Sequence, residues 1–313
     1  MNTDKQKIFW VFVALTYLIT WVPWIPLEQF AAKQGYLLPN PQTLPALLEN
    51  GLQDNTHLTL VLLSFAMIVL SGPLLAAVIA YAIESGRKGI RHLWQTSTRW
   101  RLGGRWYGIM LAILLIINLP AFIVGLIRGP LPTGSQVWTI LIWFVPVFVY
   151  TFFASGLEEP GWRGYALPNL QTRYSAKKAS VILAIIWGIW HWPVFIPVYT
   201  NTLNSPGGVP QALIMVLIQL TLYILSSMLS GALIYTWLYN RTGSVFLCML
   251  FHTLHNNVLT YLAMLFPSTN QVIPLLSAIT QWTIALVLMR FYWVEAHDSG
   301  VGQLAVQQQA SGH

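Results

Sequence analysis

Glu158-Glu159-Pro160-Gly161-Trp162-Arg163 is the stretch around which this chain is organised, because it places two adjacent carboxylates and a guanidinium at the end of a long apolar run. The sequence on either side is that of a membrane protein. An ionised side chain at the centre of a bilayer costs about 2.5 to 3.5 kcal/mol even on a lenient insertion scale. A charged cluster at the membrane edge is therefore a candidate functional site.

The composition excludes a soluble protein. Of the 313 residues, 56% are hydrophobic and only 8% are charged, against about 25% charged residues in an ordinary soluble domain. Apolar runs are spaced along the whole chain, so we expect a single membrane-embedded domain over residues 1–313. The lone Cys248 lies in an apolar run, which excludes a disulfide framework and a four-thiolate metal site.

Eight apolar runs are long enough to be transmembrane helices, since a hydrocarbon core of about 30 Å needs about 20 helical residues. They cover approximately residues 8–26, 58–83, 106–127, 137–157, 179–198, 211–239, 244–266 and 271–294. The first run lacks a small-residue cleavage site, so we interpret it as a retained span and not as a signal peptide. The predicted fold is all-α, a polytopic membrane bundle of about eight transmembrane helices.

The basic residues predict the orientation. With the N-terminus in the cytoplasm, only Lys33 and Arg128 of the 16 basic residues fall on the outer side. The cytoplasmic side then holds Lys5, Lys7, Arg87, Lys88, Arg91, Arg99, Arg101, Arg105, Arg163, Arg173, Lys177, Lys178, Arg241 and Arg290. This asymmetry predicts that both termini are cytoplasmic, in what we expect to be a bacterial plasma membrane. It also accounts for the net charge of +7 without a nucleic-acid partner.

Three segments outside the predicted spans carry weaker signals. We expect a short interfacial helix in the outer loop 27–57 and a disordered polar tail over 298–313. The inner segment 84–105 alternates basic residues with three tryptophans. Anchoring of the topology is the simpler interpretation of this segment, and an interfacial position on anionic lipid is the alternative.

The acidic residues exclude one class of protease. Of the nine acidic residues, only Glu158 and Glu159 adjoin other polar groups of the predicted spans. Asp4, Asp54 and Asp298 all lie outside the spans. An intramembrane protease with two catalytic aspartates is therefore excluded.

Three histidines lie within the predicted spans. His191 is deep in the fifth span, and Pro193 predicts a bend of the helix beside its imidazole. In the seventh span His252 and Asn256 share one helix face, with His255 close to the same stripe. Each could simply bond to a neighbouring helix, but packing alone needs none of them. Together with the two glutamates they predict a functional site.

The chemistry that this set allows is hydrolysis. A carboxylate and an imidazole can deprotonate a water molecule, or hold a metal ion that activates it, while a second imidazole and an amide donate to a developing oxyanion. The H-E-x-x-H motif of a zinc protease is absent from the sequence. Ser155 and Ser230 stay open as nucleophiles, or as small packing residues.

Three spaced motifs resemble those of the CPBP family, which comprises intramembrane proteases including CAAX prenyl protease 2 and bacteriocin-immunity relatives. They are Glu158-Glu159-x-x-x-Arg163, Trp187-x-x-x-His191 and His252-x-x-x-Asn256. The resemblance covers a protease core of approximately residues 137–266. Trp187 stands where the prenyl protease motif has Phe, and Pro160 directly follows the second glutamate.

The resemblance implies a helical bundle with a polar cavity that opens toward the cytoplasm and the lipid. The roles that it implies are water activation by Glu158 and His191, oxyanion stabilisation by His252 and Asn256, and orientation of the site by Glu159 and Arg163. Glu158, His191 and His252 are also the candidate ligands of a divalent metal such as zinc, and the residues leave open whether a metal takes part. The implied partners are membrane lipid and a membrane-associated peptide or protein substrate.

An intramembrane endopeptidase is the function that these residues favour. The alternative is a catalytically silent membrane binding or bacteriocin-immunity protein that uses the same pocket to hold a peptide or lipid. Retention of the whole motif favours the enzyme, because a binding protein needs no base opposite an oxyanion hole. A transporter with a glutamate proton relay is a weaker alternative, since the inverted halves of many such folds are not evident.

Overall fold

The computed structural model describes residues 3–40, 43–69, 71–203, 205–269 and 272–295. These residues form helices and connecting loops, with no strand among them, which confirms the all-α bundle. The expected polar tail over 298–313 and the start of the eighth predicted span at Gln271 lie outside the described residues.

The longer helices follow one another with short connections. They are α1 (Thr3–Gln34), α2 (Leu44–Asn50), α3 (Asn55–Val69), α4 (Gly72–Ser97), α5 (Gly104–Arg128), α6 (Gly134–Ala154), α8 (Leu167–Gln171), α9 (Ala176–Trp190), α10 (Ile196–Leu203), α11 (Gly208–Tyr223), α12 (Leu229–Thr242), α13 (Val245–Leu265) and α14 (Val272–Val287). Shorter turns are η1 (Gly156–Glu158), α7 (Glu159–Gly161), η2 (Trp162–Ala166), η3 (Trp192–Phe195), η4 (Ile224–Met228), η5 (Pro267–Thr269) and η6 (Leu288–Tyr292).

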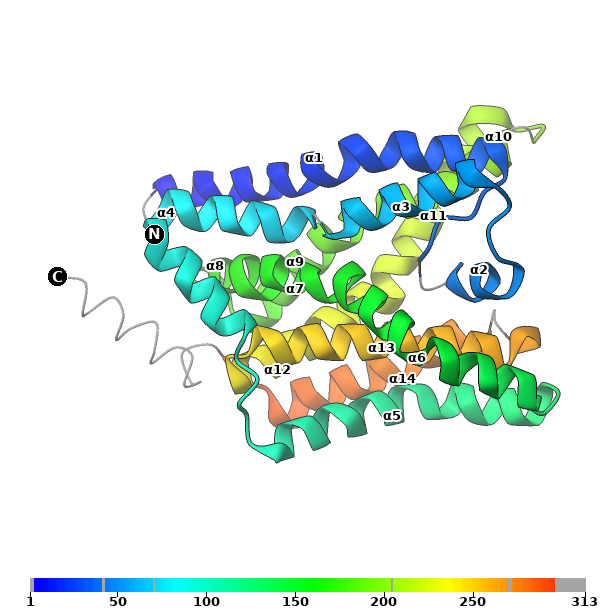
Figure 1. Cartoon of the computed structure of the whole chain (residues 1–313). Coiled ribbons are helices and arrows are strands. Elements are labelled where there is room, and N and C mark those ends of the chain that lie inside the picture. Colours follow the sequence, from blue (N-terminus) through cyan, green and yellow to red (C-terminus); the bar gives the residue numbers. More distant parts are fainter. Residues whose placement is uncertain (1–2, 41–42, 70, 204, 270–271, 296–313) are drawn as a thin grey trace.

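The long helices lie side by side in one bundle (Figure 1). Helix α1 begins at the same end of the bundle at which α14 finishes, and α4 ends and α5 begins there as well. The opposite end carries α2 and α10. The short helix expected in the outer loop is α2, while α1 continues to Gln34, well beyond the predicted end of the first span.

Most of the predicted spans correspond to helices that can cross a membrane. Among the described residues, six helical stretches are long and apolar enough by length and composition, and a bent pair formed by α9 with η3 and α10 makes up to seven. The remaining predicted span is α13, which has 21 residues. Its histidines and asparagines lower its hydropathy, so its composition alone does not mark it as a span.

Two of the predicted spans are interrupted. The second consists of α3 and α4, because the apolar run contains Gly72 and Pro73, where a new helix begins. The fifth bends by 48° between α9 and α10, next to Pro193, as predicted from the proline. Helix α4 also kinks at Gly86, whose φ of 56° is available to glycine at little cost.

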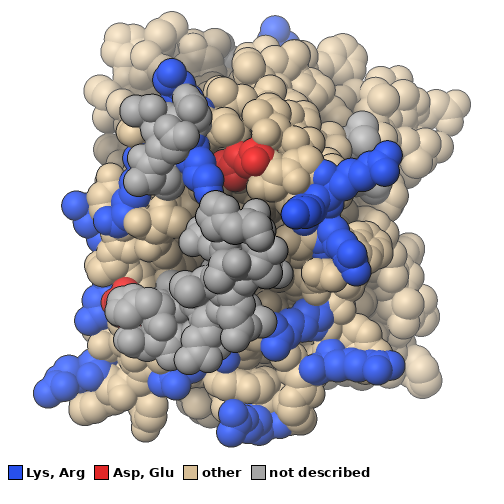
Figure 2. Space-filling view, turned by 90° about the vertical axis from the view of Figure 1, so that its left-hand side faces the viewer, with Lys and Arg blue, Asp and Glu red and all other residues tan. Residues whose placement is uncertain are grey.

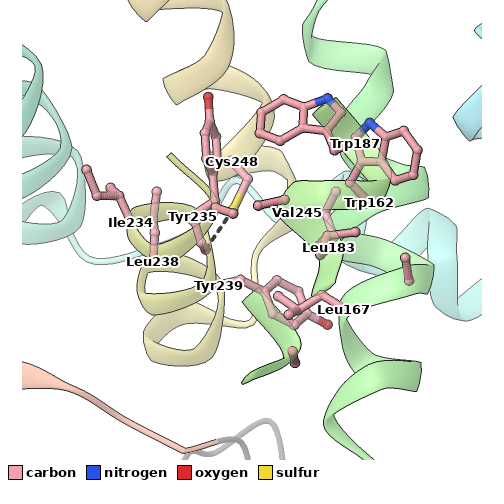
Figure 3. Close-up of a cluster of buried hydrophobic side chains, with 14 of the residues drawn as sticks. Trp162, Leu167, Leu183, Trp187, Ile234, Tyr235, Leu238, Tyr239, Val245 and Cys248 are labelled. Atoms are coloured by element: carbon pink, nitrogen blue, oxygen red, sulfur yellow. Dashed lines mark hydrogen bonds between the residues drawn. The ribbon is translucent and has the colours of Figure 1, made fainter. Parts of the chain in front are cut away.

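The hydrophobic core joins α9, α12, α13 and the segment after Glu158. Figure 3 shows Trp162 and Trp187 next to Leu183, Tyr235 and Cys248 in this cluster. The thiol of Cys248 is fully buried, as expected for a cysteine in an apolar run. Because Trp162 and Trp187 belong both to this core and to the site described next, the packing of the bundle fixes the position of the site.

Candidate active site

The stretch Glu158–Arg163 changes from one type of helical turn to another. The 3-10 turn η1 ends at Glu158, the turn α7 follows, and the π-helix η2 starts at Trp162. A Cβ atom at Gly161 would meet the carbonyl oxygen of Pro73 at 2.5 Å, so the glycine allows this stretch to approach the start of α4 closely. π-Helical turns are frequent at functional sites, because the extra residue re-aims the side chains around it.

The carboxylate of Glu158 is held through one oxygen. Its Oε2 accepts the indole N–H of Trp187 at 2.8 Å and that of Trp162 at 3.3 Å. Oε1 accepts no hydrogen bond from the described residues and is not enclosed among them. One oxygen of this nearly buried carboxylate is therefore free to receive a proton from a bound molecule.

Glu159 joins Arg163 to His252. Its Oε1 accepts from Arg163 Nη1 at 3.0 Å and lies 2.9 Å from His252 Nδ1, and both Glu159 and Arg163 are fully buried. The guanidinium carbon lies 4.4 Å from the ring centre of Trp187 and 4.2 Å from that of Tyr235. Cation–π contact and ion pairing thus stabilise the buried arginine together. The predicted role of Glu159 and Arg163 in orienting the site fits these contacts.

His191 lies at the end of α9, where the bend begins. Its Nδ1 is 2.9 Å from the carbonyl oxygen of Trp187. A carbonyl only accepts, so Nδ1 carries the proton and Nε2 is left with a lone pair. His252 likewise donates from Nδ1 to Glu159, and its Nε2 forms no hydrogen bond with the described residues.

Asn256 and His255 lie one after the other on α13 but have different surroundings. Asn256 Nδ2 donates to Ser155 Oγ at 2.7 Å, which uses one of its two amide hydrogens. His255 stacks on Phe251 with ring centres 6.3 Å apart, and its buried Nδ1 has no partner among the described residues.

The two serines left open as nucleophiles have structural partners. Ser155 Oγ accepts from Asn256. Ser230 of α12 donates to the carbonyl of Ser226 in η4 and accepts from Gln281 at 3.0 Å. Neither serine is hydrogen-bonded to a histidine in the described part of the chain, so both fit the packing interpretation better than catalysis.

The predicted site residues are brought together mainly by Trp187. Its indole nitrogen bonds to Glu158, its carbonyl bonds to His191, and its ring lies 5.5 Å from that of His252 at 87°. Glu158 and His191 share no direct hydrogen bond in the described residues, although both lie within electrostatic range of His252. Trp187 therefore contacts Glu158, His191 and His252 at once.

Sequence reasoning missed two residues that position Glu158. Trp162 follows Glu158 by four residues, a spacing that places both on one helix face. Trp187 was noted only as a substitution for Phe, but a buried indole N–H normally needs a partner. The predicted cavity at the site remains a prediction. A small pocket lies elsewhere, between α1, α8 and α9.

The candidate metal ligands do not form a metal site in this structure. No cluster of three or more His, Cys, Asp or Glu side chains suited to a metal ion occurs within the described residues. The hydrogen bonds of Glu158 and His191 leave Oε1 of Glu158 and Nε2 of His191 free, so these bonds do not by themselves exclude a metal ion. Because the side chains do not form such a cluster, the mechanism below uses no metal.

Comparison with known proteins agrees with the motifs. Residues 136–258 match the family described as type II CAAX prenyl endopeptidase Rce1-like. CAAX prenyl protease 2 of Methanococcus maripaludis is 33% identical over 153 residues, which cover 46% of this chain and 53% of that protein. The match therefore spans about half the length of this curated relative.

All the motif residues lie inside the matched segment. Together with the long apolar helices, the match shows an integral, multi-pass membrane protein. The predicted resemblance to the CPBP family is therefore confirmed, through the match of residues 136–258 to the Rce1-like type II CAAX prenyl endopeptidases.

Proposed function

We propose that this protein is an intramembrane endopeptidase that hydrolyses a peptide bond of a membrane-associated peptide or protein. The observation that supports this most directly is that each motif side chain is held through one atom and keeps another free. Glu158 keeps Oε1, and His191 and His252 each keep Nε2. Groups fixed in this way need little reorganisation when the substrate arrives.

Water activation falls to Glu158 and His191. Water between them transfers a proton to Nε2 of His191 or Oε1 of Glu158 as its oxygen attacks the scissile carbonyl carbon. The same proton then passes to the leaving amine nitrogen when the C–N bond breaks. Trp187 bonds to both residues, which supports their acting on one water molecule.

His252 and Asn256 stabilise the oxyanion. His252 can donate from Nε2 only as the imidazolium, because Nδ1 already donates to Glu159. Glu159 Oε1 holds the ring of His252 in place at 2.9 Å from Nδ1. Asn256 has a second amide hydrogen available beside the one that it gives to Ser155.

The substrate class follows from the relative. CAAX prenyl protease 2 is the name of the similar protein, so a membrane-associated peptide with a prenylated C-terminal CAAX sequence is the first substrate to assay. We place the basic end of the bundle, with both termini, in the cytoplasm of a bacterial cell.

The test is turnover of such a peptide by the full chain in lipid vesicles. Glu158→Gln removes the base but keeps the shape and the acceptors for both indoles, so we expect turnover to be nearly abolished. His255→Gln, on the same helix as His252 but without a motif role, is the control and should keep turnover. Full activity of Glu158→Gln contradicts the mechanism. Loss of activity with a chelator, restored by added zinc, contradicts a metal-free site. Folded wild type that binds the peptide without cleaving it supports a silent binding protein instead.

A further inference from the structure

We propose that residues 87–105, here called the basic segment, bind the anionic headgroups of lipids in the surrounding bilayer. This inference concerns a surface away from the motif residues and does not rest on the proposed protease activity. It begins with the position of the basic segment in the fold.

The basic segment lies beyond the hydrocarbon core. Helices α3 and α4 together cover Asn55–Ser97, a stretch of 43 residues, whereas one crossing needs about 20. The kink at Gly86 turns the rest of α4 across the end of the bundle, where α1 begins and α14 finishes (Figure 1). The half of α4 after Gly86 therefore lies at the level of the lipid headgroups.

This half of α4 has one inward face and one outward face. Gly89 and Leu93 are buried, and a Cβ atom at Gly164 would meet Leu93 at 2.6 Å, so the helix rests on η2 directly after Arg163. Arg87, Arg91 and Trp94 follow one another at helical spacing on the other face and are exposed. The helix thus shows arginine and indole side chains to its surroundings.

The charge of the basic segment is uncompensated. It contains no acidic residue, and its cations are Arg87, Lys88, Arg91, Arg99, Arg101 and Arg105. None of them is ion-paired with a carboxylate of the described residues. Arg87 and Arg91 are like charges one turn apart, an arrangement that weakens a helix in water. Contact with an anionic surface would offset the repulsion between these two arginines. Figure 2 shows Lys and Arg spread over this end of the molecule, with few acidic groups.

The exposed tryptophans indicate that the partner of the basic segment is the lipid bilayer. Trp94 is 69% exposed and Trp100 57% exposed, and the guanidinium of Arg101 lies 5.2 Å from the Trp100 ring centre. Indoles beside cations are favoured at the membrane interface, where the ring lies against acyl chains and the cation meets phosphate. A soluble acidic partner would explain the cations but not the exposed indoles at this depth.

The experiment is a titration of the full chain in detergent with phosphatidylglycerol or phosphatidylcholine, with bound lipid measured by native mass spectrometry. We expect tighter binding of phosphatidylglycerol. Arg87→Gln combined with Arg91→Gln should weaken it by on the order of fivefold per residue, the effect of about one basic residue near an anionic surface. Arg87→Lys combined with Arg91→Lys keeps the charge and should retain binding.

Arg173→Gln combined with Lys177→Gln is the matched control, since it removes the same charge from two exposed residues, one in the turn between α8 and α9 and one in α9. This pair should leave the affinity for phosphatidylglycerol close to that of wild type. The proposal is overturned if phosphatidylcholine binds equally well, if the Arg87 and Arg91 pair has no effect, or if the control pair weakens binding as much. Size-exclusion profiles of all variants establish that each is folded.

Discussion

Trp187 donates its indole N–H to the carboxylate of Glu158 across 2.8 Å, from a position in α9 that is 29 residues further along the chain. The same residue accepts from His191 through its backbone carbonyl. One residue, through its side chain and its backbone, thus contacts both groups that the proposed mechanism assigns to water activation. It also covers one face of Arg163.

Trp187→Phe should lower kcat while leaving KM little changed. The substitution keeps a ring for Arg163 but removes the hydrogen bond to Glu158, and a hydrogen bond to a charged group contributes about 1.5 to 3 kcal/mol. We expect a loss of on the order of 10- to 100-fold in turnover. Trp162→Phe is the matched control and should cost less, since its bond to Glu158 is longer at 3.3 Å. Equal losses in kcat and in thermal stability for both variants would indicate a packing role only.

His191→Ala and Asn256→Ala should differ in severity. Loss of His191 removes half of the water-activating pair, and groups that act as a unit lose most of the rate when one is deleted. Loss of Asn256 removes one oxyanion donor, with an expected cost of on the order of 10²- to 10³-fold. Single-turnover rates in vesicles, corrected for the amount of folded protein, give the comparison. A milder effect for His191→Ala than for Asn256→Ala would refute these roles.

Arg163→Ala should act on stability before it acts on chemistry. The guanidinium is fully buried and is the cation nearest to Glu159. Removing one partner of a buried pair costs about 3 to 5 kcal/mol, because the other charge is left uncompensated. Thermal unfolding in detergent measures this directly, with the exposed Arg173→Ala as the control. An unchanged unfolding temperature for Arg163→Ala would show that His252 alone compensates Glu159.

The topology predicts opposite signals from two reporter positions. The loop between α10 and α11 lies at the far end of the bundle from the start of α1 and the end of α14 (Figure 1). A reporter in residues 205–209 should therefore be periplasmic, and one fused after Glu295 should be cytoplasmic. Activity of both fusions in the same compartment would show that the number of spans is wrong.

Much of the bundle could be predicted from hydropathy, because each span needs only a long apolar run. The broken second span could not, since Gly72 and Pro73 lie inside such a run and proline is tolerated in other helices here, at Pro120 and Pro146. By contrast, Pro193 predicted its bend because it removes one backbone donor and frees the carbonyl of Ile189 beside His191.

The motif residues could be predicted from their types and spacing, but their partners could not. The bond between Trp187 and Glu158 depends on the rotation of α9 against η1, which no local pattern encodes. The salt bridge between Glu159 and His252 likewise joins residues 93 positions apart. Only contacts within one helical turn, such as Glu159 with Arg163, were accessible from spacing.

The placement of Arg163 one turn after Glu159 bears on how the chain is made. During synthesis Glu159 enters the membrane long before His252, its partner 93 positions later, has been translated. Arg163 belongs to the same short helical stretch and can neutralise the carboxylate at once. Arg163 thus compensates the charge of Glu159 until α13 joins the bundle. His252 then forms the second contact with Glu159. Variants of Arg163 should therefore be degraded during biogenesis more readily than variants of His252.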